Sequence, residues 1–250
     1  MALISDQGFV IASTRWRESS LIVRFFTLKL GKIGLAIRGA RRPKSRIGSY
    51  FDTFSHLKIV YYMRDDADLG KLKESSALDY FPSIRRDLVR FALCSLFFEI
   101  LDRGLAPRDR QRDLYRLTTD FLEGMNGEKY SPGAAPPFFL ALVARMGFAP
   151  EVGQCRSCKS SENLDSFDPA RGSAVCSRCR EKEQELIPLP ETVRGEILRF
   201  DSTRGEWNEL PPWPEKTLLP FFRIMRELVQ YHYEAGLKSA GFLMQQLKEL

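Results

Sequence analysis

The chain has 250 residues, of which 44% are hydrophobic and 28% charged, and its formal net charge is +6. This composition is typical of a globular protein with enough apolar side chains for one large domain or two smaller ones. Uncharged apolar runs such as residues 91–98 are far shorter than the roughly 20 residues that span a bilayer, which excludes a transmembrane helix.

The first eighty or so residues are predicted to form short strands. Segments 9–14, 20–28, 32–37 and 54–62 are rich in β-branched and aromatic residues, and glycines or charged turns separate them. A weaker fifth strand is expected at 72–77. Because barrel closure removes exposed edges, five short strands in so short a region predict a small closed barrel.

Positive charge is concentrated in this predicted barrel. The first fifty residues hold ten Lys and Arg against Asp6 and Glu18, a net +8, so the remainder carries −2. Such a field indicates a polyanionic partner, either nucleic acid or an anionic membrane surface. The membrane alternative is the weakest because these residues form no amphipathic helix.

The densest part of this charge is residues 38–46, a loop after the third strand with five cations in nine positions. Guanidinium groups grip phosphate oxygens bidentately, and each neutralised phosphate releases counterions, so we expect salt-sensitive nucleic-acid binding. The alternative is a solvated charged loop. The candidate nucleic-acid-binding residues are Arg24, Lys32, Arg38, Arg41, Arg42, Lys44 and Arg46.

Aromatic residues are interleaved with these cations. They are Phe25, Phe26, Tyr50, Phe51 and Phe54. On an oligonucleotide-binding barrel some aromatics stack on bases, but most of these are expected in the core. Phe25 and Phe26 are neighbours in a strand and face opposite sides, so at most one of them points into the barrel.

From Tyr80 the pattern becomes helical. Helices are expected at 82–104, 110–123, 137–146, 190–200, 218–233 and 242–250, and proline-rich joints separate some of them. Cys94 falls inside the first helix and is expected in the core. The predicted fold class is α+β, with a five-stranded barrel domain at 1–80 and a helical domain at 81–250 that carries a cysteine-rich insert at about 150–182.

The insert contains two C-x-x-C pairs separated by 17 residues. The cysteines are Cys155, Cys158, Cys176 and Cys179. This spacing is typical of zinc ribbons, in which two knuckles supply four thiolates at about 2.3 Å from a tetrahedral zinc ion. Four thiolates leave no position for an activated water, so we expect structural zinc, with nearby cations such as Arg156 and Arg178 softening the negative charge. Two unrelated pairs or a redox disulfide are the alternatives.

Motifs for catalysis are missing from the sequence. There is no Walker A motif, no G-x-S-x-G, no H-E-x-x-H and no G-x-G-x-x-G, and the two histidines, His56 and His232, are expected to be structural. Asp65, Asp66 and Asp68 could hold magnesium for a nuclease, but carboxylates are common in hairpin loops. We therefore expect a protein that is not an enzyme.

Several segments form a recognisable combination with the cysteine knuckles. They are residues 39–46 with Gly48 and Phe54, residues 99–103, residues 145–150, Tyr231-His232 and residues 237–239. Together these segments resemble the RecO family of bacterial DNA repair proteins. Ala240 and Gly241 stand where the family usually has basic residues, so this segment departs from the family's pattern.

This resemblance implies an N-terminal oligonucleotide-binding (OB) fold and a helical C-terminal domain with a zinc site. It implies DNA-binding roles for Arg38, Arg41, Arg42, Lys44 and Arg46, and zinc ligation by the four cysteines. It also implies a cytoplasmic, nucleoid-associated protein that binds single- and double-stranded DNA and anneals complementary strands without ATP. The implied partners are RecR and the C-terminal tail of the single-stranded-DNA-binding protein, and the implied role is to help RecA load. The alternative is an RNA-binding or ribosome-associated module with the same barrel and zinc ribbon.

Overall fold

The computed structural model describes residues 2–40, 51–64, 67–180, 185–203, 205–207, 210–234 and 236–249. The chain divides into two compact units. One, the barrel unit, comprises Met1–Pro82 and Leu101–Glu123; the other, the helical unit, comprises Ser83–Ile100 and Gly124–Leu250. In the described part of the chain, no helix is long and apolar enough to cross a membrane.

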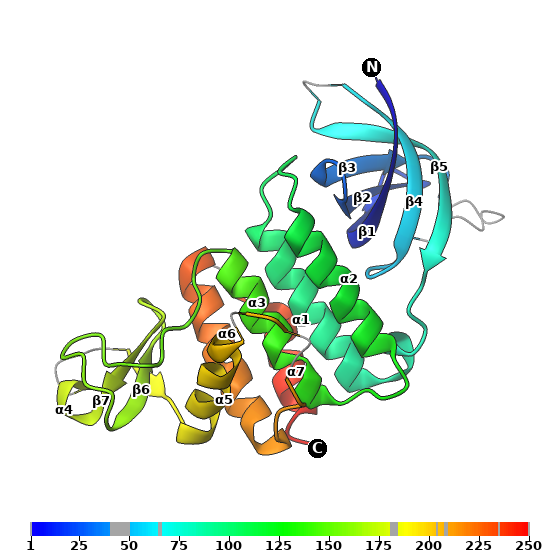
Figure 1. Ribbon diagram of the computed structural model, residues 1–250. Coiled ribbons are helices and arrows are strands. Elements are labelled where there is room, and N and C mark those ends of the chain that lie inside the picture. Colours follow the sequence, from blue (N-terminus) through cyan, green and yellow to red (C-terminus); the bar gives the residue numbers. More distant parts are fainter. Residues whose placement is uncertain are drawn as a thin grey trace. The chain divides into compact units, whose positions relative to one another are not determined.

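Five strands close into a barrel in the order β1-β2-β3-β5-β4 (Figure 1). The strands are β1 (Ala2–Trp16), β2 (Ser20–Thr27), β3 (Gly31–Ile37), β4 (His56–Met63) and β5 (Leu69–Asp79). Neighbours are antiparallel except for β3 and β5, which are parallel. The OB-like five-stranded barrel and the α+β class that the sequence predicts are thus confirmed.

Strand β1 is much longer than its predicted span of 9–14. Its first half pairs with β4 and its second half with β2, and a register shift lies between Val10 and Ala12. The first half of β1 has no alternating apolar pattern because it contains the polar run Ser5-Asp6-Gln7. Its pairing with β4 stabilises this half of the strand, and the sequence pattern does not show that pairing.

Apolar side chains from all five strands or their neighbouring loops fill the barrel. Phe25 and Phe51 meet edge to face, with ring centroids 6.3 Å apart, in this core. Phe26 points to the other side of β2 and is also fully buried, with its ring 5.4 Å from that of Tyr115 in the same unit. The prediction that only one of the two phenylalanines faces the interior is confirmed.

Six helices of at least nine residues lie close to their predicted positions. They are α1 (Leu88–Gly104), α2 (Arg112–Asn126), α3 (Pro136–Arg145), α5 (Glu191–Ser202), α6 (Glu215–Tyr233) and α7 (Lys238–Gln246). Cys94 is fully buried in α1, as expected. In the helical unit, Phe139 packs edge to face against both Phe97 and Phe222, at centroid distances of 5.6 and 5.0 Å.

Helices α1 and α7 begin furthest from the positions that the sequence predicts. Helix α1 starts at Leu88 rather than 82, because Asp87 is extended and its carboxylate accepts the N–H of Arg90 at 2.8 Å, which caps the helix. Helix α7 starts at Lys238 rather than 242, because the carboxylate of Glu99 accepts the N–H groups of Lys238 and Ser239 at 3.1 and 2.8 Å. This second cap comes from 139 residues away.

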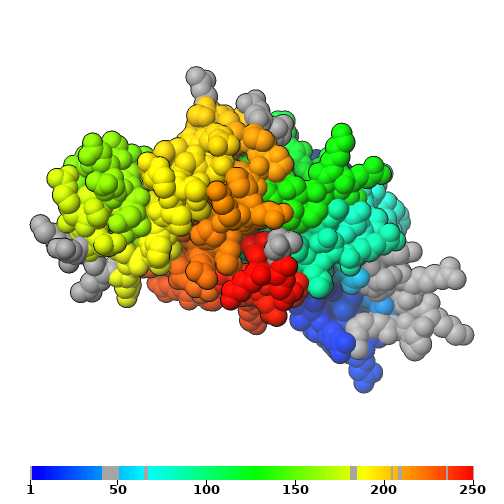
Figure 2. All heavy atoms as spheres, turned by 90° about the horizontal axis from the view of Figure 1, so that it is seen from below, coloured from blue at the N-terminus to red at the C-terminus, as the bar shows by residue number. Residues whose placement is uncertain are grey.

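The cysteine insert contains a second, smaller sheet of order β7-β6-β8. Its strands are β6 (Leu164–Asp168), β7 (Ser173–Cys176) and β8 (Ile187–Pro188), all antiparallel, and the short helix α4 (Ser177–Arg180) follows β7. In both views the insert lies at one end of the helical unit, beyond α6 (Figures 1 and 2).

Candidate metal centre and basic barrel surface

Backbone hydrogen bonds bring the two cysteine knuckles together. The first knuckle follows a segment that pairs with β7, where the N–H of Ala174 donates to Glu151 O at 2.9 Å and the N–H of Arg156 to Ala174 O at 3.0 Å. The second knuckle begins at the end of β7, and Cys176 is opposite Leu164 of β6. The hairpin β6–β7 therefore returns the chain to the first pair of cysteines.

The four sulfur atoms form a compact cluster. All lie within 4.8 Å of one another, and the Sγ atoms of Cys158 and Cys176 are 3.7 Å apart. A tetrahedral ion with bonds of about 2.3 Å holds its sulfur ligands about 3.8 Å apart, so the spacing fits. Cys155 and Cys176 are buried, whereas Cys158 is exposed and Cys179 is intermediate. The cluster is consistent with a zinc site and accounts for all four predicted ligands.

Backbone donors favour the thiolate form of two of these sulfurs, those of Cys155 and Cys176. Burial opposes ionisation of Cys155, but N–H groups of Cys158, Cys176 and Ser157 outweigh it and lower the pKa of Cys155 to about 6. Hydrogen bonding to the sulfurs of Cys176 and Cys158 raises the pKa of Cys179 to about 12. A cation among the four sulfurs would favour the thiolate form of all of them, Cys179 included.

Two of the cations near the cluster are paired with carboxylates of the insert. Arg156 Nε is 3.0 Å from Asp168 Oδ2, and Arg180 Nη1 is 3.2 Å from Asp165 Oδ2. Asp168 also accepts the N–H of Ala170 at 2.9 Å. These ion pairs link different parts of the insert. Because each carboxylate partly neutralises its arginine, the arginines have a weaker electrostatic effect on the sulfurs.

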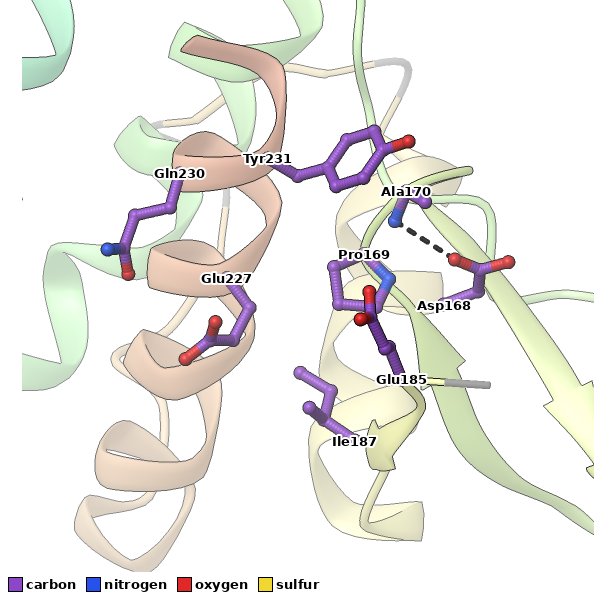
Figure 3. A pocket seen from close by; sticks show the side chains of 8 residues that line it. All are labelled: Asp168, Pro169, Ala170, Glu185, Ile187, Glu227, Gln230 and Tyr231. Atoms are coloured by element: carbon purple, nitrogen blue, oxygen red, sulfur yellow. Dashed lines mark hydrogen bonds between the residues drawn. The ribbon is translucent and has the colours of Figure 1, made fainter. Parts of the chain in front are cut away.

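A cavity of about 390 Å³ lies in the helical unit between α6 and the insert. Figure 3 shows the ring of Tyr231 extending from α6 toward Ala170, whereas the carboxylate of Asp168 points away from α6. A second carboxylate, Glu227, has its Oε1 2.9 Å from Arg226 Nε. Among the residues that the structure describes, this lining has no histidine or cysteine, and we assign the cavity no function.

On the barrel, two of the candidate cations contact the same carboxylate. Arg24 Nη2 lies 2.6 Å from Asp102 Oδ2, and Lys32 Nζ lies 3.6 Å from Asp102 Oδ1 and donates to Asp102 O at 2.6 Å. Half of the Arg24 side chain is exposed, compared with 19% for Lys32. Any phosphate that binds here competes with Asp102.

The remaining candidate cations follow β3. Arg38 is exposed and lies at a cavity on the outer face of the barrel. Arg41, Arg42, Lys44 and Arg46 fall outside the residues that the structure describes, and so does Tyr50. The nucleic-acid-binding roles of all seven cations remain predictions.

Four of the five predicted aromatics are not available for base stacking. Phe25, Phe26, Phe51 and Phe54 are at most 1% exposed. Trp16 and Tyr62, which the sequence pattern did not single out, are partly exposed and line the same cavity as Arg38. The exposure of Tyr62 could have been predicted from the alternation of side chains along β4. Its neighbour Tyr61 lies in the barrel core, so Tyr62 must face the opposite side.

His56 packs inside the barrel unit. Its Nε2 lies 2.8 Å from the hydroxyl of Tyr115, and its ring stacks on Phe9 at 4.2 Å. Burial lowers its pKa to about 4, against a smaller opposing effect of Asp79. In the helical unit, His232 stacks on Phe148 at 4.6 Å. Both contacts agree with structural roles.

The three aspartates of the nuclease alternative lie between β4 and β5 in the sequence. Asp65 and Asp66 lie outside the described residues, and Asp68 is exposed. Among the residues that the structure does describe, the four cysteines are the one group able to hold a metal ion.

Comparisons with known proteins cover almost the whole chain. Residues 1–81 match the family model for the N-terminal part of recombination protein O, and residues 85–241 match the model for its C-terminal part. A DNA repair protein RecO from Listeria monocytogenes serotype 4b is 31% identical over 188 residues, which cover 75% of this chain and 72% of that protein. A DNA repair protein RecO from Halalkalibacterium halodurans is 29% identical over 244 residues, or 96% and 93% of the two chains. One from Exiguobacterium is 29% identical over 230 residues, or 91% and 88%.

Proposed function

The chain belongs to the RecO family of DNA repair proteins, and on that basis we propose that it is a DNA-binding mediator of recombinational repair. In this proposal it anneals complementary strands without ATP. With RecR, it also helps RecA load onto single strands coated by the single-stranded-DNA-binding protein, whose C-terminal tail it binds. It acts in the cytoplasm, at the nucleoid, and is not an enzyme.

The observation that carries this proposal is the charge of the barrel segment. Ten Lys and Arg against two acidic residues lie in the first fifty positions, in a chain whose remaining part is −2. Two DNA strands repel each other through their phosphates, and cations that neutralise phosphates on both strands lower that repulsion. Pairing is favourable in itself, so the protein needs only to speed the encounter, and no nucleotide hydrolysis is required.

We propose that the cations divide into two groups. Arg38, Arg41, Arg42, Lys44 and Arg46 contact phosphates first, whereas Arg24 and Lys32 contribute less because they must leave Asp102. We also propose that the four cysteines bind structural zinc, and that the domain boundary lies near residue 80. The zinc would fix the insert and take no part in DNA chemistry, since all four of its positions are filled by sulfur.

The test is fluorescence anisotropy of labelled single-stranded DNA at several salt concentrations, followed by addition of the complementary strand without ATP. We expect tight, steeply salt-dependent binding and faster pairing. The double variant Arg41→Ala/Arg42→Ala should weaken binding and reduce the slope of log affinity against log salt by roughly 1.4 for a single strand. RNA of the same sequence tests the alternative, because a preference for it requires contacts to the 2′-hydroxyl.

A matched control removes two arginines from the helical unit. Arg194→Ala/Arg199→Ala on α5 changes the net charge equally, and both side chains form ion pairs within their own helix. This control should leave the salt slope unchanged. An equal loss of slope in both double variants would mean that net charge, rather than the barrel loop, determines binding.

A further inference from the structure

The outer face of the barrel has a cavity of about 340 Å³, within the range of about 300–1,000 Å³ that small-molecule sites occupy. Its lining combines two partly exposed aromatic rings with three cations. The aromatics are Trp16 and Tyr62, and the cations are Arg38, Arg64 and Lys71. The cavity therefore joins the two side-chain classes that recognise a nucleotide.

Strand register explains why these side chains meet. Ala36 of β3 and Tyr62 of β4 both pair with Lys71 of β5, so the three residues form one row across the sheet. Arg38 and Arg64 directly follow the ends of β3 and β4, two residues after Ala36 and Tyr62, and line the same cavity. Their immediate neighbours Leu35, Ile37, Tyr61 and Met63 lie in the barrel core. The side chains of this row therefore lie on the outer face of the barrel, next to Arg38 and Arg64.

Trp16 comes from the end of β1, at the turn into β2. The guanidinium of Arg17 lies over its ring, 4.4 Å from the centroid. This cation covers one face of the indole and adds positive charge beside the cavity. A planar ligand would stack on the other face of the ring.

The charge of the lining selects an anionic ligand. The described lining residues include three cations and no carboxylate. Aromatic side chains give sequence-tolerant stacking because every base has a π-face, and nearby cations hold the phosphates on either side of a stacked base. In a duplex the bases are stacked inside the helix, so only an unpaired nucleotide can enter.

We propose that this cavity binds an unpaired nucleotide of single-stranded DNA, with the base against Trp16 and Tyr62 and its flanking phosphates on Arg38, Arg64 and Lys71. This inference rests on the proposed DNA-binding function and deepens it. Phosphate contacts elsewhere on the barrel serve both strand forms, and the cavity adds affinity for single strands alone.

Intrinsic fluorescence tests this on the unmodified chain. Of the three tryptophans, Trp207 and Trp213 are 6% and 3% exposed, so Trp16 is the one able to stack on a base. Titration with oligothymidylate should quench the tryptophan emission, whereas a duplex of equal length should leave it nearly unchanged. Equal quenching by both, or none by a single strand that anisotropy shows to be bound, would overturn the inference.

Variants give the energetic test. Trp16→Ala and Tyr62→Ala should each lower affinity for single-stranded DNA by about tenfold, within the range for loss of one base stack, and leave duplex affinity within about twofold. Neither removes a charge, so the salt slope should stay the same, and Trp16→Phe should restore most of the affinity. Tyr231→Ala on α6, where the side chain is 54% exposed, is the matched control and should bind like the unmodified chain.

The outcomes separate this inference from the proposed function. If the unmodified chain binds and anneals DNA but both barrel variants keep their single-strand affinity, the cavity is not a nucleotide site and the proposed function stands. A parallel loss of single-strand and duplex affinity would show that the aromatics support the barrel rather than contact a base. If the unmodified chain binds no DNA at low salt, the proposed function and the inference fail together.

Discussion

The two β-sheets of this chain are stabilised in different ways. The barrel β1–β5 encloses a core of buried apolar side chains that includes Phe25, Phe51 and Tyr61. Each such side chain contributes roughly 1.5–3 kcal/mol when it leaves water. The sheet β6–β8 has short strands of two to five residues, and Phe167 is the largest of its fully buried side chains.

Sulfur takes the place of apolar volume in the smaller sheet. Cys155 and Cys176 are buried where a larger domain would place aliphatic side chains, and the sulfur cluster joins both knuckles. Small segments need such a cross-link because they cannot bury enough apolar surface to offset the entropy of ordering the chain. The barrel differs from the smaller sheet because its own apolar core stabilises it. The inner face of the barrel supplies this stability, so its outer face is free to carry charged side chains and exposed aromatics.

Removal of the sulfur cluster is expected to give the largest effect. Cys176→Ser should release the metal and unfold the insert, because metal binding supplies about 10–16 kcal/mol in small zinc domains. The barrel should remain folded and bind DNA, since its core contains no metal ligand. Metal content by atomic absorption and DNA affinity by anisotropy, measured on the same preparation, check both parts.

Cys94→Ala provides the matched control for this experiment. It removes one of the five cysteines, from the buried core of α1, and should keep one metal ion per chain. If Cys176→Ser loses DNA binding while its barrel remains folded, the claim that the barrel binds DNA independently of the insert is wrong. A metal-free variant with an intact insert would contradict the structural role of the cysteines.

The sequence predicts features that depend on local pattern. The cysteine cluster follows from the spacing within and between the knuckles, and the barrel strands follow from alternation, because both patterns reflect neighbours along the chain. Most helix positions are likewise close to expectation, whereas the strands β6–β8 of the insert were not predicted.

The features that sequence reasoning missed depend on contacts between distant residues. Glu99 caps a helix that starts 139 residues later, and Asp102 pairs with Arg24, which lies 78 residues away. Trp16 and Tyr62 come together only because β1 and β4 are strands of one closed barrel. These contacts join residues far apart in the sequence, so no local pattern predicts them. The position of a charged residue in the sequence does not identify its partner in the fold.

Acid should destabilise the barrel through His56. Burial lowers the pKa of this histidine to about 4 in the folded chain, below its ordinary value of 6.5. The unfolded chain therefore takes up the proton first as pH falls. The contribution of His56 to the free energy of unfolding should therefore be constant above about pH 6.5 and decrease between pH 6.5 and 4, by on the order of 2 kcal/mol.

Urea unfolding of the barrel, followed at pH 7.5 and at pH 5, measures this loss. His56→Gln should reduce the difference between the two midpoints, whereas His232→Gln in the helical unit should preserve it. Metal release from the insert also depends on pH, because thiolates must be deprotonated to bind. Metal content measured at each pH separates the two transitions. An unchanged pH dependence in His56→Gln would place the acid sensitivity outside the barrel core.

The smallest expected effect concerns Asp102, which holds two of the barrel's cations. Asp102→Asn removes a carboxylate that pairs with Arg24 and Lys32, and both cations then become available to phosphates. We expect single-strand affinity to rise about threefold at low salt and stability to change by less than about 1 kcal/mol, as for other partly exposed ion pairs. Anisotropy titrations at two salt concentrations check the rise, which should shrink at the higher one.

Asp165→Asn makes the same charge change in the smaller sheet, where the carboxylate pairs with Arg180. Because the proposed DNA surface lies on the barrel, this variant should leave DNA affinity unchanged. An equal rise in both variants would mean that DNA responds to net charge over the whole chain. A fall in Asp102→Asn alone would mean that the carboxylate positions Arg24 for its phosphate contact, so that the ion pair is part of the DNA surface rather than a competitor to it.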